Sequence, residues 1–172
     1  MKFLRVLNVK APTRGTSVAA GIDFFVPECT KEFIEMFKEK NPNIELRTEY
    51  NHMYDDGTIV LGPHERVNIP SGIKAEVPHG YALIAYNKSG VSLKYGLDIG
   101  ASVVDEDYKG QIHLSLVNTS DDIVYINCGQ KIVQFVLIPV NYEMPEEVNS
   151  EEELFTRDSE RGEGAFCSTG EK

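Results

Sequence analysis

The feature that most constrains the fold is a series of short β-rich runs between residues 58 and 140. Branched and aromatic residues dominate each run, several runs alternate apolar with polar side chains, and Gly, Pro, Asn or Asp separates them. The runs cover residues 58–61, 66–69, 73–77, 81–86, 112–118, 123–126 and 132–138. Many short strands at this spacing predict an all-β fold, either a jelly-roll-like barrel or a sandwich.

An insert at about residues 28–57 interrupts this pattern. Thr30 can cap a helix, Phe33, Ile34 and Phe37 fall on one helical face, and Pro42 ends the segment. We therefore expect a short amphipathic helix whose apolar face packs on the chain's own β core. Docking of another protein on this face is the alternative, and the sequence identifies no partner for the insert.

Charge and composition predict two parts, a β domain over residues 1–142 that includes the insert, and a tail over residues 143–172. The net charge is −10, which argues against nucleic-acid binding, because that would require a basic surface. Many acids lie in residues 143–163, which we interpret as a solvated linker. The glycine-rich arm that follows, residues 161–170 (RGEGAFCSTG), is too polar for a core, so we expect it to be mobile.

The cysteines and the apolar runs indicate in which cellular compartment the protein is expected. The chain has an odd number of cysteines, Cys29, Cys128 and Cys167, and they lie far apart in the sequence. Their spacing to each other and to the four histidines is not that of a zinc site. This usage is typical of a reducing compartment, so we expect a cytoplasmic protein. No run of about 18 apolar residues is present, so no membrane-spanning helix is expected. The first seven residues are expected to form a strand rather than a secretion signal.

Residues 103–108 (VVDEDY) contain the strongest candidate for a catalytic carboxylate. A solvated turn is the commoner reason for three adjacent acids, but the flanking runs place them at the bend of a predicted β-hairpin. Alternation would then give Asp105 and Asp107 a common orientation, opposed to Glu106. A carboxylate held there could take a proton from water and make it a nucleophile.

Two further segments carry groups suited to phosphate. In residues 87–92 (NKSGVS), Lys88 supplies positive charge and Ser89 a hydrogen-bond donor. Gly90 has no side chain, so its backbone N–H can approach an anion closely. An ordinary surface turn is the alternative, and the Walker pattern is absent. In the arm, Arg161 could fork onto phosphate while the isolated Phe166 could stack on a base, although a chance aromatic in a disordered tail is also possible.

Two polar side chains lie inside otherwise apolar strands. Asp23 follows Ile22 and precedes Phe24, so its carboxylate needs a partner such as Lys88. Gln134 lies in residues 129–135 (GQKIVQF), where it could also be a satisfied strand amide.

Together and in order, these segments resemble the five motifs of the trimeric dUTP pyrophosphatase (dUTPase) family. The matching segments are residues 20–24 (AGIDF), 87–90 (NKSG), 100–110 (GASVVDEDYKG), 129–134 (GQKIVQ) and 161–170 (RGEGAFCSTG). The resemblance spans residues 20–170 and leaves the insert uncovered. One such motif would be weak, whereas five in the right order are specific.

The resemblance implies a jelly-roll-like fold and a homotrimer with active sites at subunit interfaces. It implies hydrolysis of dUTP to dUMP and pyrophosphate, with Mg²⁺ bound through the substrate phosphates rather than by protein ligands. Such an activity limits uracil incorporation into DNA and supplies dUMP for thymidylate synthesis. Asp105 would activate the water that attacks the α-phosphorus, and Asp23 and Lys88 would complete the catalytic set.

The resemblance also assigns the substrate contacts. Tyr108 would pack under the deoxyribose and exclude a 2′-hydroxyl, while the hairpin backbone, including His113, would read the uracil. A neighbouring subunit's Phe166 would stack on the base. The remaining substrate-binding positions are Ser89, Gly90, Ser102, Val104, Gln134, Arg161, Ser168 and Thr169.

Several positions depart from the family pattern. Lys88 stands where Arg is usual, so a bidentate fork becomes a point charge. Asn87 replaces Pro, Ser102 stands where Gly is common, and Ala165 and Cys167 replace glycines in the arm. Two alternatives remain: a dCTP deaminase-like enzyme of the same fold, which the arm and residues 105–108 argue against, and a nucleotide-gated regulatory protein whose insert binds a partner.

Overall fold

The computed structural model describes residues 1–48, 57–159 and 162–164. Contacts divide the chain into two units, Met1–Asn141 and Tyr142–Lys172, which we describe separately. Nowhere in the described ranges is a helix both long and apolar enough to cross a membrane. Arg161, Phe166, Ser168 and Thr169 of the predicted arm lie outside the described residues.

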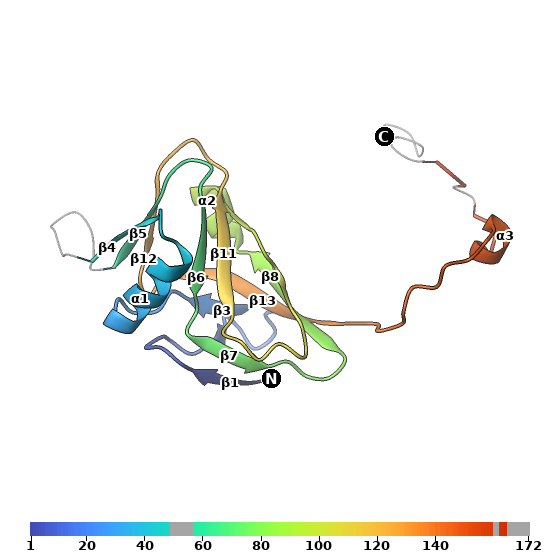
Figure 1. The fold of residues 1–172 in the computed structure, drawn as a ribbon, viewed down its shortest axis with the longest axis horizontal. Coiled ribbons are helices and arrows are strands. Elements are labelled where there is room, and N and C mark those ends of the chain that lie inside the picture. Colours follow the sequence, from blue (N-terminus) through green and yellow to red (C-terminus); the bar gives the residue numbers. More distant parts are fainter. Residues whose placement is uncertain (49–56, 160–161, 165–172) are drawn as a thin grey trace. The chain divides into compact units, whose positions relative to one another are not determined.

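The largest sheet of the first unit is antiparallel and has the strand order β10-β8-β13-β3-β2. Its strands are β10 (Val103–Val104), β8 (Tyr81–Asn87), β13 (Lys131–Pro139), β3 (Ile22–Phe25) and β2 (Thr13–Arg14). β13 lies between β8 and β3, so segments from the middle and the two ends of the β domain meet side by side in this sheet (Figure 1).

Three smaller antiparallel sheets complete the first unit. They are β6 (Arg66–Pro70), β11 (His113–Asn118) and β9 (Leu97–Ile99); β12 (Val124–Asn127), β5 (Thr58–Leu61) and β4 (Glu45–Arg47); and β1 (Lys2–Arg5) with β7 (Ile73–Glu76). Along β11, Leu114 and Leu116 are buried while Ser115 between them is partly exposed, as alternation requires.

The core lies between these sheets. The rings of Phe24 in β3 and Phe135 in β13 pack with centroids 4.6 Å apart, and Leu83 of β8 is fully buried beside them in the same cluster. The predicted all-β, jelly-roll-like fold is confirmed, as is the strand predicted within the first seven residues.

Helix α1 (Lys31–Lys40) forms where the sequence predicts it. The Thr30 hydroxyl accepts a hydrogen bond from the Phe33 amide at 3.3 Å, which caps the first turn. Phe33 and Phe37 are fully buried against the chain's own core, so the insert packs on the β domain. Asn41 ends the helix. Its Oδ1 accepts from the Asn68 backbone N–H at 2.8 Å and its Nδ2 donates to the Asn68 carbonyl at 3.0 Å, so this side chain bonds the edge of β6 as a neighbouring strand would.

One sequence expectation is wrong. The acidic residues 105–107 do not join two paired strands: β10 pairs with β8, whereas β11 pairs with β6 and β9. The segment between β10 and β11 therefore connects two sheets, because alternation specifies the face of a strand but not its partner. The alternative interpretation of residues 87–92, an ordinary surface turn, is not found either: the residues after Lys88 begin α2 (Ser89–Tyr95), which ends at Gly96 with φ of 64°.

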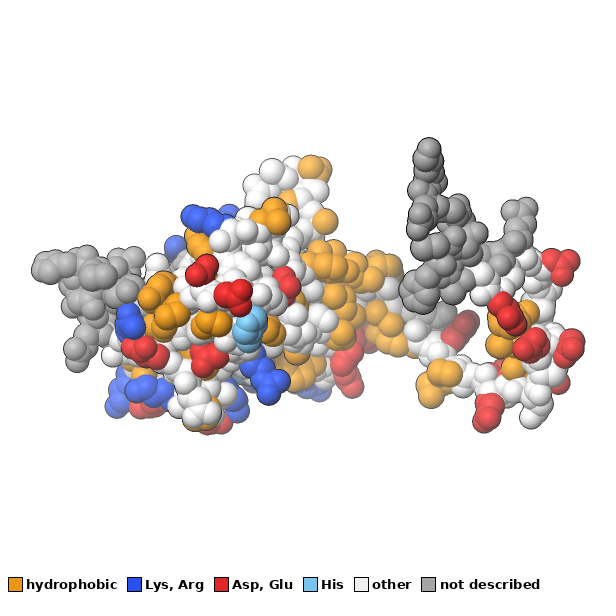
Figure 2. Space-filling view, turned by 90° about the horizontal axis from the view of Figure 1, so that it is seen from above, with side chains coloured by type: hydrophobic (Ala, Val, Ile, Leu, Met, Phe, Trp, Pro, Cys, Tyr) orange, Lys and Arg blue, Asp and Glu red, His pale blue; other side chains and the backbone are white. Residues whose placement is uncertain are grey.

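The second unit contains one short described helix, α3 (Glu151–Leu154). The Ser150 hydroxyl accepts a hydrogen bond from the Glu153 amide at 3.3 Å and caps it. Acidic side chains are prominent on this unit (Figure 2).

Candidate active site

Asp23 is the centre of a buried charge cluster. Asp23 is only 7% exposed. Its Oδ1 accepts a hydrogen bond from Lys88 Nζ, and its Oδ2 accepts one from Lys131 Nζ at 3.2 Å. The predicted Asp23–Lys88 pair is thus present. The sequence does not indicate the contact of Lys131 with Asp23, because only the β3–β13 register, with its irregularity between Lys131 and Val133, creates it.

The cluster holds Asp23 in its ionised form. Burial alone would raise the pKa of the Asp23 carboxyl, but the hydrogen bonds and charges of Lys88 and Lys131 outweigh it, and the net pKa lies below its usual value. The carboxylate in turn fixes the direction of Lys88 at the end of β8. A cation so fixed is ready to meet an anionic ligand without reorganisation.

Gln134 brings the first, second and fourth of the matching segments together. Its Nε2 donates to the backbone carbonyl of Asn87 at 2.7 Å. A Cβ on Gly21 would lie 2.0 Å from Gln134 Oε1, so only glycine there leaves space for this side chain. Segments from three different strands therefore converge on one end of the five-stranded sheet.

The structure gives Asn87 a reason to replace proline. Its Nδ2 donates to Asp98 Oδ1 at 2.8 Å, and its Oδ1 accepts from the Ile99 amide at 2.9 Å. The Ser92 hydroxyl donates to the same Asp98 oxygen at 3.1 Å. The Asn87 side chain thus ties the end of β8 to β9 and, through Asp98, to α2.

Ser89 and Gly90 open helix α2 directly after Lys88. The first amides of a helix have no acceptor within it. Apart from the adjoining residues and the backbone of α2, no described atom lies within 4 Å of where a Gly90 Cβ would be. A phosphate oxygen can therefore approach these two residues beside the Lys88 ammonium.

The acidic residues 105–107 form the second candidate region. Asp105 and Asp107 are exposed, whereas Glu106 is partly buried and accepts from His79 Nδ1 at 2.7 Å and from the Gly80 amide at 2.8 Å. Glu106 is therefore structural and anchors the turn to the β7–β8 connection. Asp105 is exposed, and exposure alternates along residues 105–107 although they lie outside a strand.

Tyr108 folds back over the end of this turn. Its hydroxyl donates to the Gln111 carbonyl at 2.9 Å, and a Cβ on Gly110 would lie 2.3 Å from the same hydroxyl. Gly110 is thus needed for this placement. The residue remains 43% exposed, so part of it is accessible to a ligand.

His113 begins β11 beyond this turn and is half-buried. Burial is the main cause that lowers its pKa below the usual histidine value, and the charge of Lys40 acts in the same direction against a hydrogen bond to the Gln111 backbone. Val104 pairs with Leu83, and the carbonyl of Ser102 accepts from the Ala85 amide at 2.8 Å. These residues therefore contribute backbone groups of fixed position.

Comparison with known proteins places this geometry in a family. The dUTPase family model matches residues 52–170. A deoxyuridine 5′-triphosphate nucleotidohydrolase of Hydrogenobaculum is 38% identical over 119 residues, 68% of this chain and 79% of that protein. The mouse protein of the same name is 30% identical over 172 residues, 99% of this chain and 85% of its own length. This chain belongs to the dUTPase family.

A solved dUTPase shares the fold. The dUTPase of Staphylococcus bacteriophage 80alpha, in complex with dUPNHPP, has a TM-score of 0.71 and 24% identity, covering 98% of this chain and 97% of that one. The family model, in contrast, begins at residue 52 and leaves most of the insert unmatched.

Within one chain, the two regions of this dUTPase family member stay apart. Val104 pairs with Leu83 near one end of β8, whereas Lys88 follows Asn87 at the other. The four steps between Leu83 and Asn87 span about 13 Å at the rise of an extended strand. The structure therefore groups Asp23, Lys88 and Gln134 with Ser89 and Gly90, and separately groups Asp105 with Tyr108.

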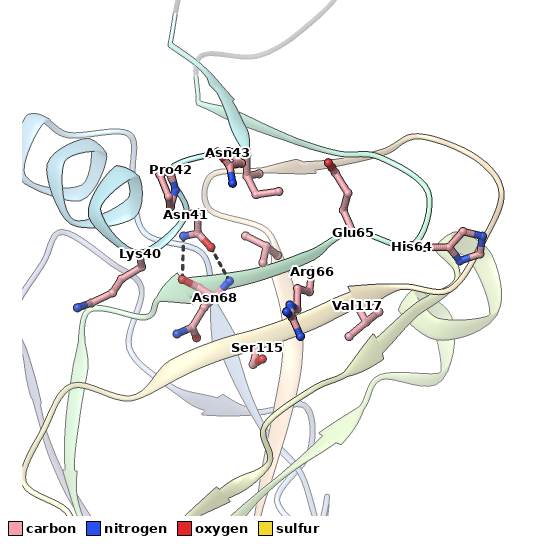
Figure 3. Close-up of a pocket in the computed structure, with 12 residues that line it drawn as sticks. Lys40, Asn41, Pro42, Asn43, His64, Glu65, Arg66, Asn68, Ser115 and Val117 are labelled. Carbon is pink, nitrogen blue, oxygen red and sulfur yellow. Dashed lines mark hydrogen bonds between the residues drawn. The ribbon is translucent and has the colours of Figure 1, made fainter.

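Three cavities of the β domain differ in whether predicted site residues line them. One of about 640 Å³ lies between the end of α1 and the edge of β6, lined by Lys40, Asn43 and Arg66, and it contains none of the predicted site residues (Figure 3). Another of about 490 Å³ includes Ser102 and Asn87. Tyr108 lines a third, of about 630 Å³, beside β1 and β7.

Proposed function

We propose that this chain hydrolyses dUTP to dUMP and pyrophosphate. The observation that carries the proposal is Asp105, a solvent-directed carboxylate in the segment that most closely resembles the family's third motif, in a chain that belongs to the dUTPase family. Its neighbour Glu106 is occupied by His79 and Gly80, so Asp105 is left to act on water.

In the proposed mechanism, Asp105 takes a proton from a water molecule while the oxygen of that water attacks the α-phosphorus. A bond forms between this oxygen and phosphorus, and the bond from phosphorus to the bridging oxygen of the β-phosphate breaks. Pyrophosphate leaves with the electron pair of that bond. General base assistance of this kind contributes about 10²–10⁴-fold to a rate.

The charge cluster provides the proposed phosphate site. Lys88, directed by Asp23, supplies positive charge, while Ser89, Gly90 and the Gln134 amide donate hydrogen bonds. Because Lys88 is a point charge and not a fork, it fixes the direction of a phosphate less strictly than arginine would. Arg161, Ser168 and Thr169 of the arm are proposed to complete the grip.

The acidic turn provides the proposed nucleoside site. The exposed face of Tyr108 packs under the deoxyribose, where a 2′-hydroxyl would collide with the ring. The backbone near Ser102, Val104 and His113 reads the uracil edge and leaves no room for a 5-methyl group. Phe166 of the arm stacks on the base.

We propose a homotrimer whose active sites are shared between copies. The phosphate site and Asp105 lie at opposite ends of β8, so a second copy is needed to bring them to one substrate. The arm after residue 143 comes from a neighbouring copy. This arrangement corresponds to a β domain over residues 1–142 and a linker and arm over residues 143–172.

Mg²⁺ is proposed to bind through the substrate. Across the described ranges, no group of three or more His, Cys, Asp or Glu residues is arranged to hold a metal ion. The exposed Asp105 and the cationic cluster fit a triphosphate that brings its own ion, since Mg²⁺ readily keeps phosphate and water ligands. The bound ion would neutralise phosphate charge during the reaction.

In the cell, we propose that this activity operates in the cytoplasm, limits uracil incorporation into DNA and supplies dUMP. The test is incubation with Mg²⁺ and, separately, dUTP, dTTP, dCTP or UTP, with pyrophosphate and nucleotide products measured. We expect dUMP and pyrophosphate from dUTP alone at an appreciable rate. Ammonia release from dCTP would instead establish the deaminase alternative, and no dUMP would refute the proposal.

A further inference from the structure

The insert has a narrow neck where three backbone segments meet. The chain enters the insert at Cys29 and leaves it at Gly57, and Cys128 lies in the turn between β12 and β13. The Cys128 amide donates to the Gly57 carbonyl at 2.8 Å, and the Gly57 amide donates to the Arg47 carbonyl at 3.1 Å. We call Cys29, Gly57 and Cys128 the neck of the insert.

Both thiols of the neck face the same point. A Cβ on Gly57 would lie 2.5 Å from Cys29 Cβ, 3.0 Å from Cys29 Sγ and 2.6 Å from Cys128 Sγ. The two sulfurs are therefore within about 6 Å of each other, and side-chain rotation between staggered conformers can close such a gap. Gly57 has φ of 84°, so glycine is favoured there by its backbone as well as by the space.

Accessibility and location make this pair a candidate for oxidation. Cys29 and Cys128 are both thiols, and neither residue is fully buried. They are 99 positions apart in the sequence, so spacing alone does not reveal the pair. The folded β domain creates the juxtaposition through the pairing of β12 with β5, where Asn127 lies opposite Thr58.

We propose that Cys29 and Cys128 form a reversible intrachain disulfide when the protein meets a hydroperoxide. The thiolate of one cysteine attacks the peroxide oxygen, giving a sulfenic acid and, from hydrogen peroxide, water. The second thiol attacks the sulfenic sulfur, the S–S bond forms and a second water leaves. Two thiols thus lose two electrons and two protons to the peroxide, and a dithiol reductant reverses the change.

The crosslink would brace the strands that carry the phosphate site. Cys29 follows β3, which contains Asp23, and Cys128 precedes β13, which contains Lys131 and Gln134. Joining them also closes a long loop and lowers the entropy of the unfolded chain. In a reducing compartment such a bond is transient and responds to oxidants. This inference does not depend on the identity of the substrate.

The test uses the full chain carrying Cys167→Ser, so that only the neck thiols remain, with wild type in parallel. The reduced protein is treated with hydrogen peroxide and then digested without reductant for mass spectrometry. We expect a peptide pair joined through Cys29 and Cys128, loss of both titratable thiols, and a rise in Tm of roughly 5–15 °C. Dithiothreitol should reverse all three changes, and wild type should give the same joined pair.

Cys128→Ser in the same background is the matched control. It keeps the size of the side chain and removes one sulfur, so we expect no crosslink within the chain and no rise in Tm. The proposal is overturned if Cys29 and Cys128 accumulate as separate sulfinic acids, or if oxidation yields crosslinks between chains. It is also overturned if the Tm of the oxidised Cys128→Ser control rises as much as that of its parent.

Discussion

The two regions of the candidate site differ in how firmly the fold holds them. Asp23 is buried between Lys88 and Lys131, and its hydrogen bonds join three strands or strand ends. The Asp105 carboxylate, in contrast, is exposed and makes no hydrogen bond or ion pair with the described residues. Fixed charges suit a site that must bind an anion without reorganisation, whereas the general base must remain open to water and substrate. The charge cluster around Asp23 is thus formed within one chain, whereas the Asp105 carboxylate has no fixed partner among the described residues.

The largest expected effect tests the open region. Replacing Asp105 with Asn removes the base while keeping its shape, so we expect kcat for dUTP to fall by about 10²–10⁴-fold. Pyrophosphate release measures it, with Asp107→Asn as the matched control, because Asp107 is equally exposed in the same turn. Equal losses in the two variants would show that the turn contributes only general negative charge.

The second prediction concerns selection of the sugar. Tyr108→Ala should lower the preference for dUTP over UTP by about 10–100-fold, because the ring that excludes a 2′-hydroxyl is lost. Tyr108→Phe keeps the ring and removes only the bond to the Gln111 carbonyl, so its preference should remain close to wild type. The ratio of kcat/KM for the two nucleotides is the measurement, and an unchanged ratio in Tyr108→Ala would exclude this role.

A third prediction loosens the firmly held region. Asp23→Asn leaves Lys88 and Lys131 without their carboxylate, and because Lys131 is half exposed we expect a loss of about 1–2 kcal/mol in unfolding free energy, below the usual range for a buried pair. Urea denaturation measures this loss. Lys88 would also lose its direction, so KM for dUTP should rise more than kcat falls. The reverse pattern would place Asp23 in the chemical step.

The smallest expected effect is on the pH dependence of stability, to which His113 and His79 contribute with opposite signs. Burial lowers the pKa of His113, so the folded state prefers its neutral form and stability is lost as the pH falls through about 6.5. The hydrogen bond that His79 donates to Glu106, together with the negative charge of Glu106, raises the pKa of His79, so the stabilisation from this pair is present at low pH and lost as the pH rises.

Tm measured between pH 5.5 and 7.5 tests both signs. His113→Gln should lose less stability than wild type on acidification, and His79→Gln should lose more. The same pH dependence in both variants would contradict the assignment. The lowered pKa of Asp23 acts at lower pH, where stability is lost as the pH falls through the folded-state value.

Local patterns in the sequence predict the parts of the molecule that depend on local physics. The strands follow alternation, α1 follows its Thr30 cap and the spacing of Phe33 and Phe37, and Asp23 requires a cation because it is surrounded by apolar residues. The partner of β10 and the contact of Lys131 with Asp23 depend on how distant segments pair. The periodicity of side chains along one strand carries no information about this pairing.

Two further features show the same limit. Helix α2 is short and mixed in character, so its residues resemble a turn until Gly96 ends the helix in the left-handed region. Asn87 is a departure from the family pattern whose role becomes visible only with Asp98 and Ile99 beside it. The contributions of Arg161, Phe166, Ser168 and Thr169 stay predictions, since these residues lie outside the described ranges.

The most direct test of the central claim, that Asp105 and the Lys88 cluster act together from different copies, is complementation. Asp105→Asn and Lys88→Ala proteins, each of low activity, are unfolded together, refolded as a mixture and assayed for pyrophosphate release from dUTP. Random mixing in a homotrimer with sites shared between neighbours should restore about a quarter of the wild-type sites. Activity no greater than the average of the two separate variants would contradict the account.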